Sequence, residues 1–231
     1  MQAIILAGGL GTRLSTKLNG LPKPMVPIGE SPFISLLLDK IINGGVKSVV
    51  LSVGYRYEKI KYYFGNAYRS VPIQYSIENK PLGTGGAIKK ALQCVTGDSI
   101  LVFNGDSYFD LDLNEFLKFH EVRNSSITIG IKKMKNADRY GTVLLDNDYR
   151  VIKFKEKNKT KNSYINCGVY ALKKNLFDDF GSFKQKFSFE KDFLEKKDNI
   201  SIYGFPSVGN FIDIGTPKDL SRAKFFFMSE I

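Results

Sequence analysis

Apolar and amphipathic segments alternate regularly over the first 110 residues of the chain. Continuous apolar runs, typical of strands buried on both faces, occur at residues 2–8, 46–55 and 99–110, and residues 71–78 alternate as a strand does. Between these runs, apolar residues recur at helical spacing in residues 31–45, 57–66 and 83–95. This order predicts a mostly parallel sheet that is flanked by helices.

Capping residues mark the ends of several predicted helices. We expect Ser31 to be the N-cap of the first helix, with Pro32 in its first turn and Gly44 at its end. Gly65 is expected to end the second helix, and Asp112 to cap a helix over residues 112–124. These signals place the helices between the strands of the predicted sheet.

The second half of the chain is richer in strands. Strand-like segments cover residues 125–134, 140–157, 163–174 and 199–215, and a last helix is predicted over residues 217–231. Residues 146–149 read as a hairpin turn between two strands. The C-terminus has no hexapeptide repeat, so no β-helix extension is expected, and residues 1–231 are interpreted as a single α/β domain.

Composition narrows the possible partners. The formal net charge of +11 indicates anionic partners, but the basic residues are spread along the chain and no nucleic-acid motif accompanies them, so nucleic-acid binding is not predicted. Cys94 and Cys167 have no metal-site spacing and are expected to be reduced thiols. No apolar run approaches the roughly 20 residues of a membrane span. We therefore expect a soluble cytoplasmic protein without a membrane partner.

A glycine-rich turn follows the first predicted strand. Gly8, Gly9 and Gly11 precede Arg13, but the turn has neither the third glycine of a dinucleotide fingerprint nor the Gly-Lys-Ser/Thr of a Walker A loop. Successive backbone N–H groups can instead form an anion-binding nest, and the guanidinium of Arg13 matches phosphate oxygens. The turn is interpreted as a phosphate site at the carboxyl edge of the sheet.

Two further segments are expected at the same edge. Lys23 lies between Pro22 and Pro24, which stiffen the backbone so that its charge is held in place. A second glycine-rich loop begins at Glu78 and leads into a helix, whose N-terminus favours phosphate. Small residues in this loop leave room for a flat base, and Glu78 or the backbone could read its polar edge.

Carboxylates at the ends of two strands suggest a cation site. Asp106 belongs to the sequence Asn-Gly-Asp, which ends a predicted buried strand, and Asp213 lies between two isoleucines. Two such carboxylates can share a Mg²⁺ that is bound to nucleotide phosphates, although Asp213 could instead cap the helix that follows Thr216. His120, the single histidine, is expected at the surface. Without a histidine, the site is suited to positioning and charge neutralisation rather than acid–base hydrolysis.

Together these motifs resemble the sugar-1-phosphate nucleotidyltransferases (nucleotide-sugar pyrophosphorylases). The resemblance covers residues 4 to about 220, and its motifs, in the family's order, are "LAGGLGTRL", Lys23-Pro24, "PLGTGGA", "NGD", "YGTV", Glu156-Lys157, "NCGVY" and "FIDIGTP". "KPMVPIG", "VVLSVGY" and "PLGTGGAI" look most like the D-glycero-D-manno-heptose 1-phosphate guanylyltransferases and their mannose-1-phosphate relatives.

The resemblance implies a Rossmann-like fold, with a nucleotide-binding part at about residues 1–115 and a sugar-phosphate-binding part at about 125–215. It implies direct in-line transfer of a nucleoside monophosphate from an NTP, with GTP favoured, to a sugar 1-phosphate, with release of pyrophosphate. The nucleotide would be bound by Leu6, Ala7, Gly8, Gly9, Gly11, Thr12, Arg13, Lys23, Glu78, Gly83, Thr84, Asn104 and Asp106. Arg13, Lys23 and Asp106 would be catalytic, and Asp106 and Asp213 would bind Mg²⁺. The sugar phosphate would be bound by Gly141, Glu156, Lys157, Asn166 and Gly168.

Several alternatives stay open. Asn158 stands where many relatives have proline after the Glu-Lys pair, which leaves open the path of this loop and the direction in which Lys157 points. The acceptor could be mannose 1-phosphate, the base could be cytosine or uracil, and a non-catalytic sugar-nucleotide sensor is a third hypothesis. The apolar residues near the C-terminus, 223–231, could cover the chain's own core or serve a homodimer.

Overall fold

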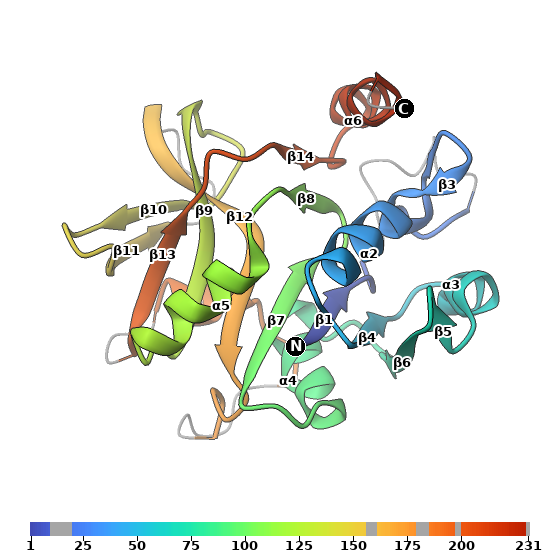
Figure 1. Cartoon of the computed structure of the whole chain (residues 1–231), viewed down its shortest axis with the longest axis horizontal. Helices are drawn as coiled ribbons and strands as arrows, with labels where there is room; N and C mark the ends of the chain where they lie inside the picture. Colours follow the sequence, from blue (N-terminus) through green and yellow to red (C-terminus); the bar gives the residue numbers. More distant parts are fainter. Residues whose placement is uncertain (10–19, 156–160, 179–184, 197–199, 230–231) are drawn as a thin grey trace.

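A computed structural model describes residues 1–9, 20–155, 161–178, 185–196 and 200–229 of the chain. The centre of its largest sheet is parallel, with four strands side by side (Figure 1). In spatial order these are β7 (Ser99–Asn104), β1 (Gln2–Leu6), β4 (Ser48–Val53) and β6 (Val71–Ile77). The predicted parallel core is therefore confirmed.

The strand-rich half of the chain extends this same sheet. The long strand β12 (Lys161–Lys173) runs antiparallel to β7 and joins the two halves. The remaining strands of this half are β9 (Ile127–Asn136), β10 (Thr142–Leu145), β11 (Val151–Lys155) and β13 (Ile202–Pro206). β10 and β11 form the predicted hairpin, in which Asp146 Oδ1 accepts hydrogen bonds from the backbone N–H groups of Asp148 and Arg150.

Within the described residues, five α-helices accompany the strands. They are α2 (Phe33–Asn43), α3 (Tyr57–Phe64), α4 (Gly83–Ala91), α5 (Leu113–Val122) and α6 (Pro217–Ser229). Gly44 and Gly65 are the C-caps of α2 and α3, and Asp112 caps α5 by accepting hydrogen bonds from two backbone N–H groups, as predicted. The helix-end signals in the sequence were thus read correctly at these three positions.

The prediction that Ser31 caps α2 is wrong. Ser31 and Pro32 form β3 (Ser31–Pro32), which pairs with β2 (Pro27–Ile28) in a short hairpin, and Pro32 is the N-cap. The backbone N–H of Phe33 donates to the carbonyl of Val26 at 2.9 Å. A backbone carbonyl therefore satisfies the first helical N–H group, and no serine side chain is needed.

Short elements complete the fold. They are the 3₁₀ turns η2 (Lys23–Met25) and η3 (Leu92–Cys94), the π-helical turn η4 (Phe189–Leu194), and the strands β5 (Ala67–Tyr68), β8 (Ser107–Phe109) and β14 (Phe211–Asp213). The sequence pattern did not indicate η4. Its phenylalanines lie against α4, on one side of the sheet.

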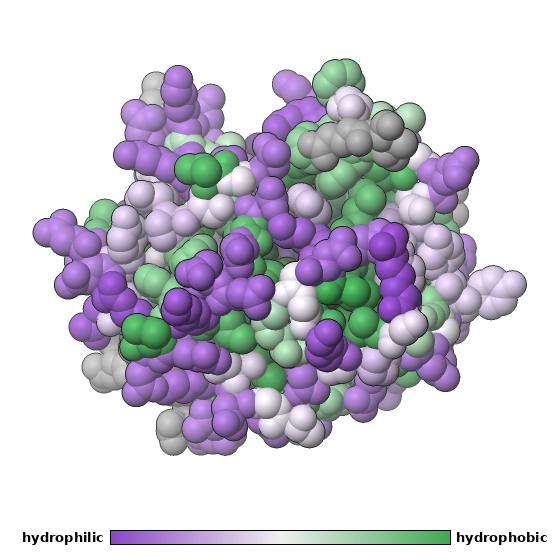
Figure 2. Space-filling view, viewed as in Figure 1, coloured by the Kyte–Doolittle hydropathy of each residue, from purple (hydrophilic) through white to green (hydrophobic). Residues whose placement is uncertain are grey.

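Successive residues of β1 pack on opposite faces of the sheet, which explains its continuous apolar run. Ala3 and Ile5 belong to the core cluster beneath α2 and α5, whereas Ile4 belongs to the cluster beneath α4 and η4. Figure 2 shows hydrophilic side chains over most of the face that carries α2 and α5, with hydrophobic ones gathered mainly toward its middle.

Some apolar residues of the last helix, α6, pack in the core and others lie at the surface. Phe227 packs edge-to-face against Phe33 and Tyr108, with ring centroids 6.3 and 5.1 Å away. Phe225 and Met228 remain exposed. No helix within the described ranges is both long enough and apolar enough to cross a membrane.

Candidate active site

A cavity of about 450 Å³ lies at the carboxyl ends of β1 and β7, beside the start of α4. This edge is where open α/β sheets bind their ligands. The cavity is lined by Leu6, Gly8, Gly9, Lys23, Pro24, Glu78, Pro81, Gly83, Thr84, Ala87, Asn104 and Asp106. Residues from four separate stretches of the chain therefore meet here.

Most residues that the sequence assigned to the nucleotide line this cavity. Ala7 does not, because its side chain is buried in the core and its backbone N–H donates to the carbonyl of Ser52 at 2.7 Å. Gly11, Thr12 and Arg13 fall outside the described residues. Pro24, Pro81 and Ala87 line the cavity without having been assigned to it.

Lys23 is held by the turn η2. The backbone N–H of Met25 donates to the carbonyl of Pro22 at 2.8 Å, and that of Val26 donates to the carbonyl of Lys23 at 3.1 Å. Lys23 Nζ donates to Asp106 Oδ2 at 2.5 Å, and the two side chains are 12% and 44% exposed. The site thus already contains a paired cation and carboxylate.

Asp213 is brought to Asp106 by strand pairing. β14 runs antiparallel to β8 so that Asp213 is paired with Ser107, and the backbone N–H of Ile214 donates to the carbonyl of Asp106 at 3.0 Å. Burial, followed by the charge of Asp106, raises the pKa of Asp213. The backbone N–H of Asp219 donates to the Thr216 hydroxyl at 3.3 Å, so Thr216 caps α6 and the alternative of an Asp213 cap is not observed.

The oxygen donors around Asp106 are suited to a hard divalent cation. Asn104 Oδ1 is buried and has no hydrogen-bond partner among the described atoms. No group of three or more His, Cys, Asp or Glu residues within the described ranges could hold a metal by itself. Mg²⁺ commonly takes one or two carboxylates together with substrate phosphates and water, so a pair of carboxylates fits this mode of binding.

Glu78 lines the cavity, and two hydrogen bonds hold its carboxylate in place. Its Oε2 accepts a hydrogen bond from the backbone N–H of Leu82 at 2.9 Å, and its Oε1 accepts a longer one from the Ser52 hydroxyl at 3.5 Å. A Cβ at Gly8 would lie 2.8 Å from Glu78 Oε1, so glycine at this position leaves the carboxylate its space. Burial raises the pKa of Glu78.

The start of α4 packs on the segment that precedes η4. The N–H of Gly85 donates to the carbonyl of Phe187 at 3.0 Å, and the N–H of Phe187 donates to the carbonyl of Leu82 at the same distance. Thr84 Oγ1 donates to Glu190 Oε2 at 2.6 Å and accepts from the N–H of Phe189 at 2.8 Å. The small residues of this loop therefore also serve packing within the chain.

Three predicted sugar-phosphate residues lie together, and one of them contacts the Asn104 turn, which lines the cavity. The N–H of Asn166 donates to the carbonyl of Gly141 at 2.8 Å, and β12 is irregular between Asn166 and Tyr170. Gly168 has a φ of +71°, and a Cβ there would lie 2.7 Å from Asn104 Nδ2, so glycine lets the irregular part of β12 approach the Asn104 turn. Glu156 and Lys157 lie outside the described residues.

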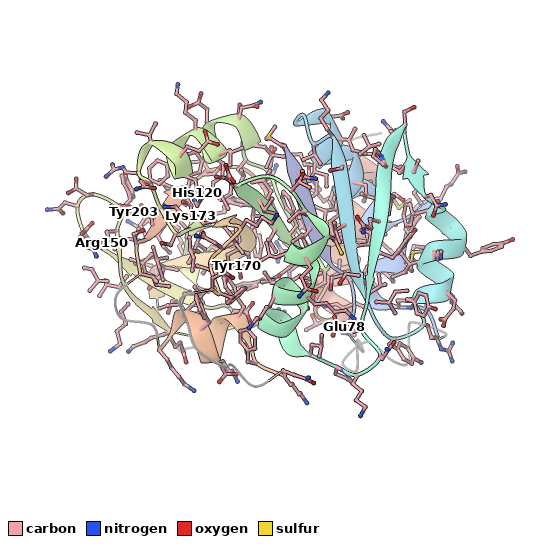
Figure 3. The ribbon with its side chains drawn as sticks, turned by 90° about the horizontal axis from the view of Figure 1, so that it is seen from below. Glu78, His120, Arg150, Tyr170, Lys173 and Tyr203 are labelled. Carbon is pink, nitrogen blue, oxygen red and sulfur yellow. The ribbon has the colours of Figure 1, made fainter. Side chains whose placement is uncertain are left out.

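The expectation that His120 lies at the surface is wrong. Its side chain is 1% exposed, and Nδ1 is 2.9 Å from the Thr128 hydroxyl. Figure 3 shows His120 beside Lys173, on the other side of Tyr170 from Glu78. Burial, and secondarily the charge of Lys173, lowers the pKa of His120 to about 4. The sequence did not indicate this burial, because His120 lies in a helix with polar residues as neighbours.

Because His120 is buried and neutral, acid should cost the protein stability. Below its ordinary pKa of 6.5 the unfolded chain binds a proton that the native chain takes up only near pH 4, so the free energy of unfolding falls across that window. In urea unfolding, we expect the free energy of unfolding of His120→Asn to fall less between pH 6.5 and pH 5 than that of the wild type. Equal slopes for the two proteins would show that His120 does not titrate in this way.

Comparisons with known proteins show which proteins this chain is similar to. A D-glycero-alpha-D-manno-heptose 1-phosphate guanylyltransferase of Aneurinibacillus thermoaerophilus is 46% identical over 97% of each chain. One from Campylobacter jejuni is 45% identical over 95% of this chain and 96% of its own. The crystal structure of HddC from Yersinia pseudotuberculosis matches with a TM-score of 0.87 and 37% identity over 98% of this chain and 99% of its own. HddC has also been solved in a complex with GMP-PN.

The match to a family model extends over almost the whole sequence. The model for nucleotidyl transferases covers residues 2–230, and thus both the parallel core and the strand-rich half. It includes every motif on which the resemblance was based. On this evidence the chain belongs to the nucleotidyl transferase family.

Proposed function

We propose that this chain transfers the guanylyl group of GTP to D-glycero-D-manno-heptose 1-phosphate, giving GDP-heptose and pyrophosphate. The observation that carries the proposal is the meeting of Lys23, Glu78 and Asp106 around one cavity. Near full-length identity of 45–46% to two guanylyltransferases of this heptose phosphate, together with the GMP-PN complex of HddC, supports the choice of substrates.

The reaction requires charge neutralisation more than proton transfer. A phosphate oxygen of the sugar 1-phosphate attacks the α-phosphorus of GTP in line, and the bond to the pyrophosphate oxygen breaks. A phosphomonoester has a second pKa of about 6, so the attacking group is largely dianionic at neutral pH. Lys23 would neutralise charge at the α-phosphate, and Arg13 would stabilise the departing pyrophosphate. No histidine is among the described residues that line the cavity.

Asp106 and Asp213 would hold Mg²⁺ in this proposal. A metal held by these carboxylates would supply positive charge that offsets the charge of the nucleotide phosphates. The ion pair between Lys23 and Asp106 places the lysine that would neutralise the phosphate next to a carboxylate that would hold the metal.

The sugar phosphate would lie beside the Asn104 turn and the irregular part of β12, which pack against each other. Asn166 and Gly168 would contact the sugar, Gly141 would let it approach the backbone, and Glu156 and Lys157 would bind its hydroxyls and phosphate. One continuous sheet carries both groups of residues, because β12 pairs directly with β7. The proposal therefore treats residues 1–231 as one catalytic domain with two binding parts.

Glu78 would select guanine. The Watson–Crick edge of guanine presents two neighbouring donors, N1–H and N2–H₂, which a carboxylate can accept as a pair. The N–H of Leu82 holds one oxygen of Glu78 in place but leaves lone pairs free. Adenine presents an acceptor at N1 instead, so an ionised Glu78 would repel it.

Glu78→Gln should weaken the use of GTP. Loss of charge-assisted hydrogen bonds worth about 1.5–3 kcal/mol should lower kcat/KM for GTP by roughly 10- to 100-fold. In the wild type the KM for GTP should rise as the pH falls through the raised pKa of Glu78, since the protonated acid accepts less well. Steady-state kinetics against pH would measure both effects.

Two comparisons make this prediction specific. The Glu78→Gln enzyme should lack the acid rise in KM for GTP, whereas Glu58→Gln, at an exposed position on α3, should behave like the wild type. An unchanged GTP preference in Glu78→Gln would remove this residue from base recognition.

Pyrophosphate release tests the proposed function itself. GTP, CTP, UTP, ATP and dTTP would each be combined with Mg²⁺ and with heptose, mannose or glucose 1-phosphate. We expect turnover to be highest for GTP with the manno-configured heptose 1-phosphate. Preference for mannose 1-phosphate or another base would keep the reaction and change the substrate. A folded protein that binds nucleotide but turns over no pair would support the sensor hypothesis instead.

A homodimer is also part of the proposal. Phe225 and Met228 on α6 are 78% and 57% exposed, which leaves apolar area for a second subunit. Sedimentation of the wild type and of a Phe225→Ser variant would test it, with a monomeric wild type contradicting the proposal.

A further inference from the structure

Polar side chains connect the irregular part of β12 to the start of α4. Asn166 Nδ2 donates to Tyr170 Oη at 2.7 Å, and Tyr170 Oη donates to Glu190 Oε1 at 3.4 Å. Thr84 Oγ1 donates to Glu190 Oε2 at 2.6 Å. These four residues, here called the Glu190 link, come from β12, η4 and α4.

The centre of the link is buried. Tyr170 is fully buried, and its ring meets that of Phe189 edge-to-face with centroids 5.2 Å apart. Figure 3 shows Tyr170 in the middle of the molecule, between Glu78 on one side and His120 with Lys173 on the other. Hydrogen bonds in such surroundings are electrostatically stronger than in water.

The directions of the hydrogen bonds are consistent along the whole link. The N–H of Gly168 donates to Asn166 Oδ1 at 3.0 Å, which turns Nδ2 of the same amide toward Tyr170. Tyr170 Oη accepts that bond and so has its hydrogen available for Glu190. Thr84 Oγ1 accepts from the N–H of Phe189 at 2.8 Å and likewise donates to Glu190. An ionised carboxylate only accepts, so Glu190 sets the direction from both ends.

The two ends of the link lie in different parts of the proposed active site. Thr84 lines the nucleotide cavity at the start of α4. Asn166 neighbours Gly168, which packs against Asn104 and Ser107 next to Asp106. We expect a shift at one end to affect the other, because Tyr170 is fully buried and Glu190, which is half-buried, contacts both Tyr170 and Thr84.

We propose that Glu190 and Tyr170 are positioning residues that hold the sugar-phosphate and nucleotide parts of the site in register. Tyr170 fixes the orientation of the Asn166 amide, and Glu190 ties this orientation to the position of Thr84. The inference rests on the proposed function, in which Asn166 contacts the sugar and the start of α4 contacts the base. Neither Tyr170 nor Glu190 needs to touch a substrate.

Tyr170→Phe removes one hydroxyl and keeps the ring that packs on Phe189. We expect it to raise the KM for the sugar 1-phosphate by about 5- to 10-fold, as the loss of one buried hydrogen bond does, with a smaller change in kcat. Glu190→Gln should raise KM for the sugar 1-phosphate and for GTP, since it disturbs both ends. Tyr75→Phe, which loses a hydroxyl bond to the carbonyl of Gly65 outside the site, is the matched control and should be unaffected.

A double-mutant cycle separates positioning from simple loss of stability. Thr84→Val removes the hydroxyl that binds Glu190, and should raise the KM for the sugar 1-phosphate although Thr84 lies in the nucleotide cavity. In a Tyr170→Phe background this effect should largely disappear, because the link is already broken. Thermal melts would confirm that each variant is folded under the assay conditions.

The outcomes separate this inference from the function on which it rests. Wild-type protein that turns over no nucleotide and sugar-phosphate pair would refute the proposed function and, with it, this inference. An active wild type with additive effects of Thr84→Val and Tyr170→Phe, or with folded variants whose KM values equal those of the wild type, would refute the link alone. Coupled KM changes in an active enzyme would support it.

Discussion

Replacing Asp106 with asparagine is expected to lower turnover by about 10²-fold or more, as losses of transition-state charge stabilisation commonly do. The amide has nearly the same shape, so Lys23 Nζ can still donate to its oxygen, but the negative charge that would hold Mg²⁺ beside Asp213 is gone. Pyrophosphate release, measured over a range of Mg²⁺ concentrations, should show a lower maximum and a higher half-saturating concentration.

Asp110 provides the matched control. It also pairs with a lysine, Lys40, but does not line the cavity. Asp110→Asn should therefore keep its turnover and its Mg²⁺ dependence. A near-normal rate in Asp106→Asn, or equal losses in both variants, would remove Asp106 from the proposed role.

Lys23→Ala is expected to lower kcat by a similar factor of about 10² while leaving Mg²⁺ binding intact or stronger. Lys23 is the cation that pairs with Asp106 in the structure, so its removal frees a carboxylate for the metal. The loss of rate would come from the uncompensated charge on the α-phosphate. The half-saturating Mg²⁺ concentration, which should rise in Asp106→Asn, should not rise in Lys23→Ala.

Lys40→Ala is the corresponding lysine control, since it breaks an ion pair of the same kind outside the cavity. If Lys23→Ala instead loses Mg²⁺ affinity in parallel with Asp106→Asn, the two residues act as one structural pair. In that case Lys23 has no separate role at the phosphate.

Local patterns predicted most of the parallel core. The strands β1, β4 and β7 are apolar on both faces because helices cover both sides of the sheet, and this leaves a clear signal in the sequence. Gly65 and Asp112 marked helix ends correctly. The backbone N–H of Gly65 and the side chain of Asp112 each make the hydrogen bonds that end or begin the helix. Ser31 failed because the chain around it folds back as a hairpin and supplies a carbonyl instead.

The candidate site was also largely visible in the sequence. Glu78 and Asp106 follow the ends of β6 and β7, and parallel strands bring such ends to one edge, whereas Lys23 reaches this edge from the turn η2. Arg13, Glu156 and Lys157 remain predictions. The sequence did not indicate the proposed roles of Tyr170 and Glu190. The turn η4 is only six residues long, too short to leave a helical pattern, and its contacts are with residues distant in the sequence.

The sequence alone determined the alternating order of strands and helices, the glycine turns and the residues with chemistry at the strand ends. These are local properties, since backbone preference and hydrophobic periodicity depend on near neighbours. The tertiary structure decided which distant groups meet. It paired Asp213 with the Asp106 turn, buried His120 against Thr128 and joined Asn166 to Thr84 through Glu190. Such contacts arise from packing of the whole chain, because burial and long-range hydrogen bonds are set only when the elements come together.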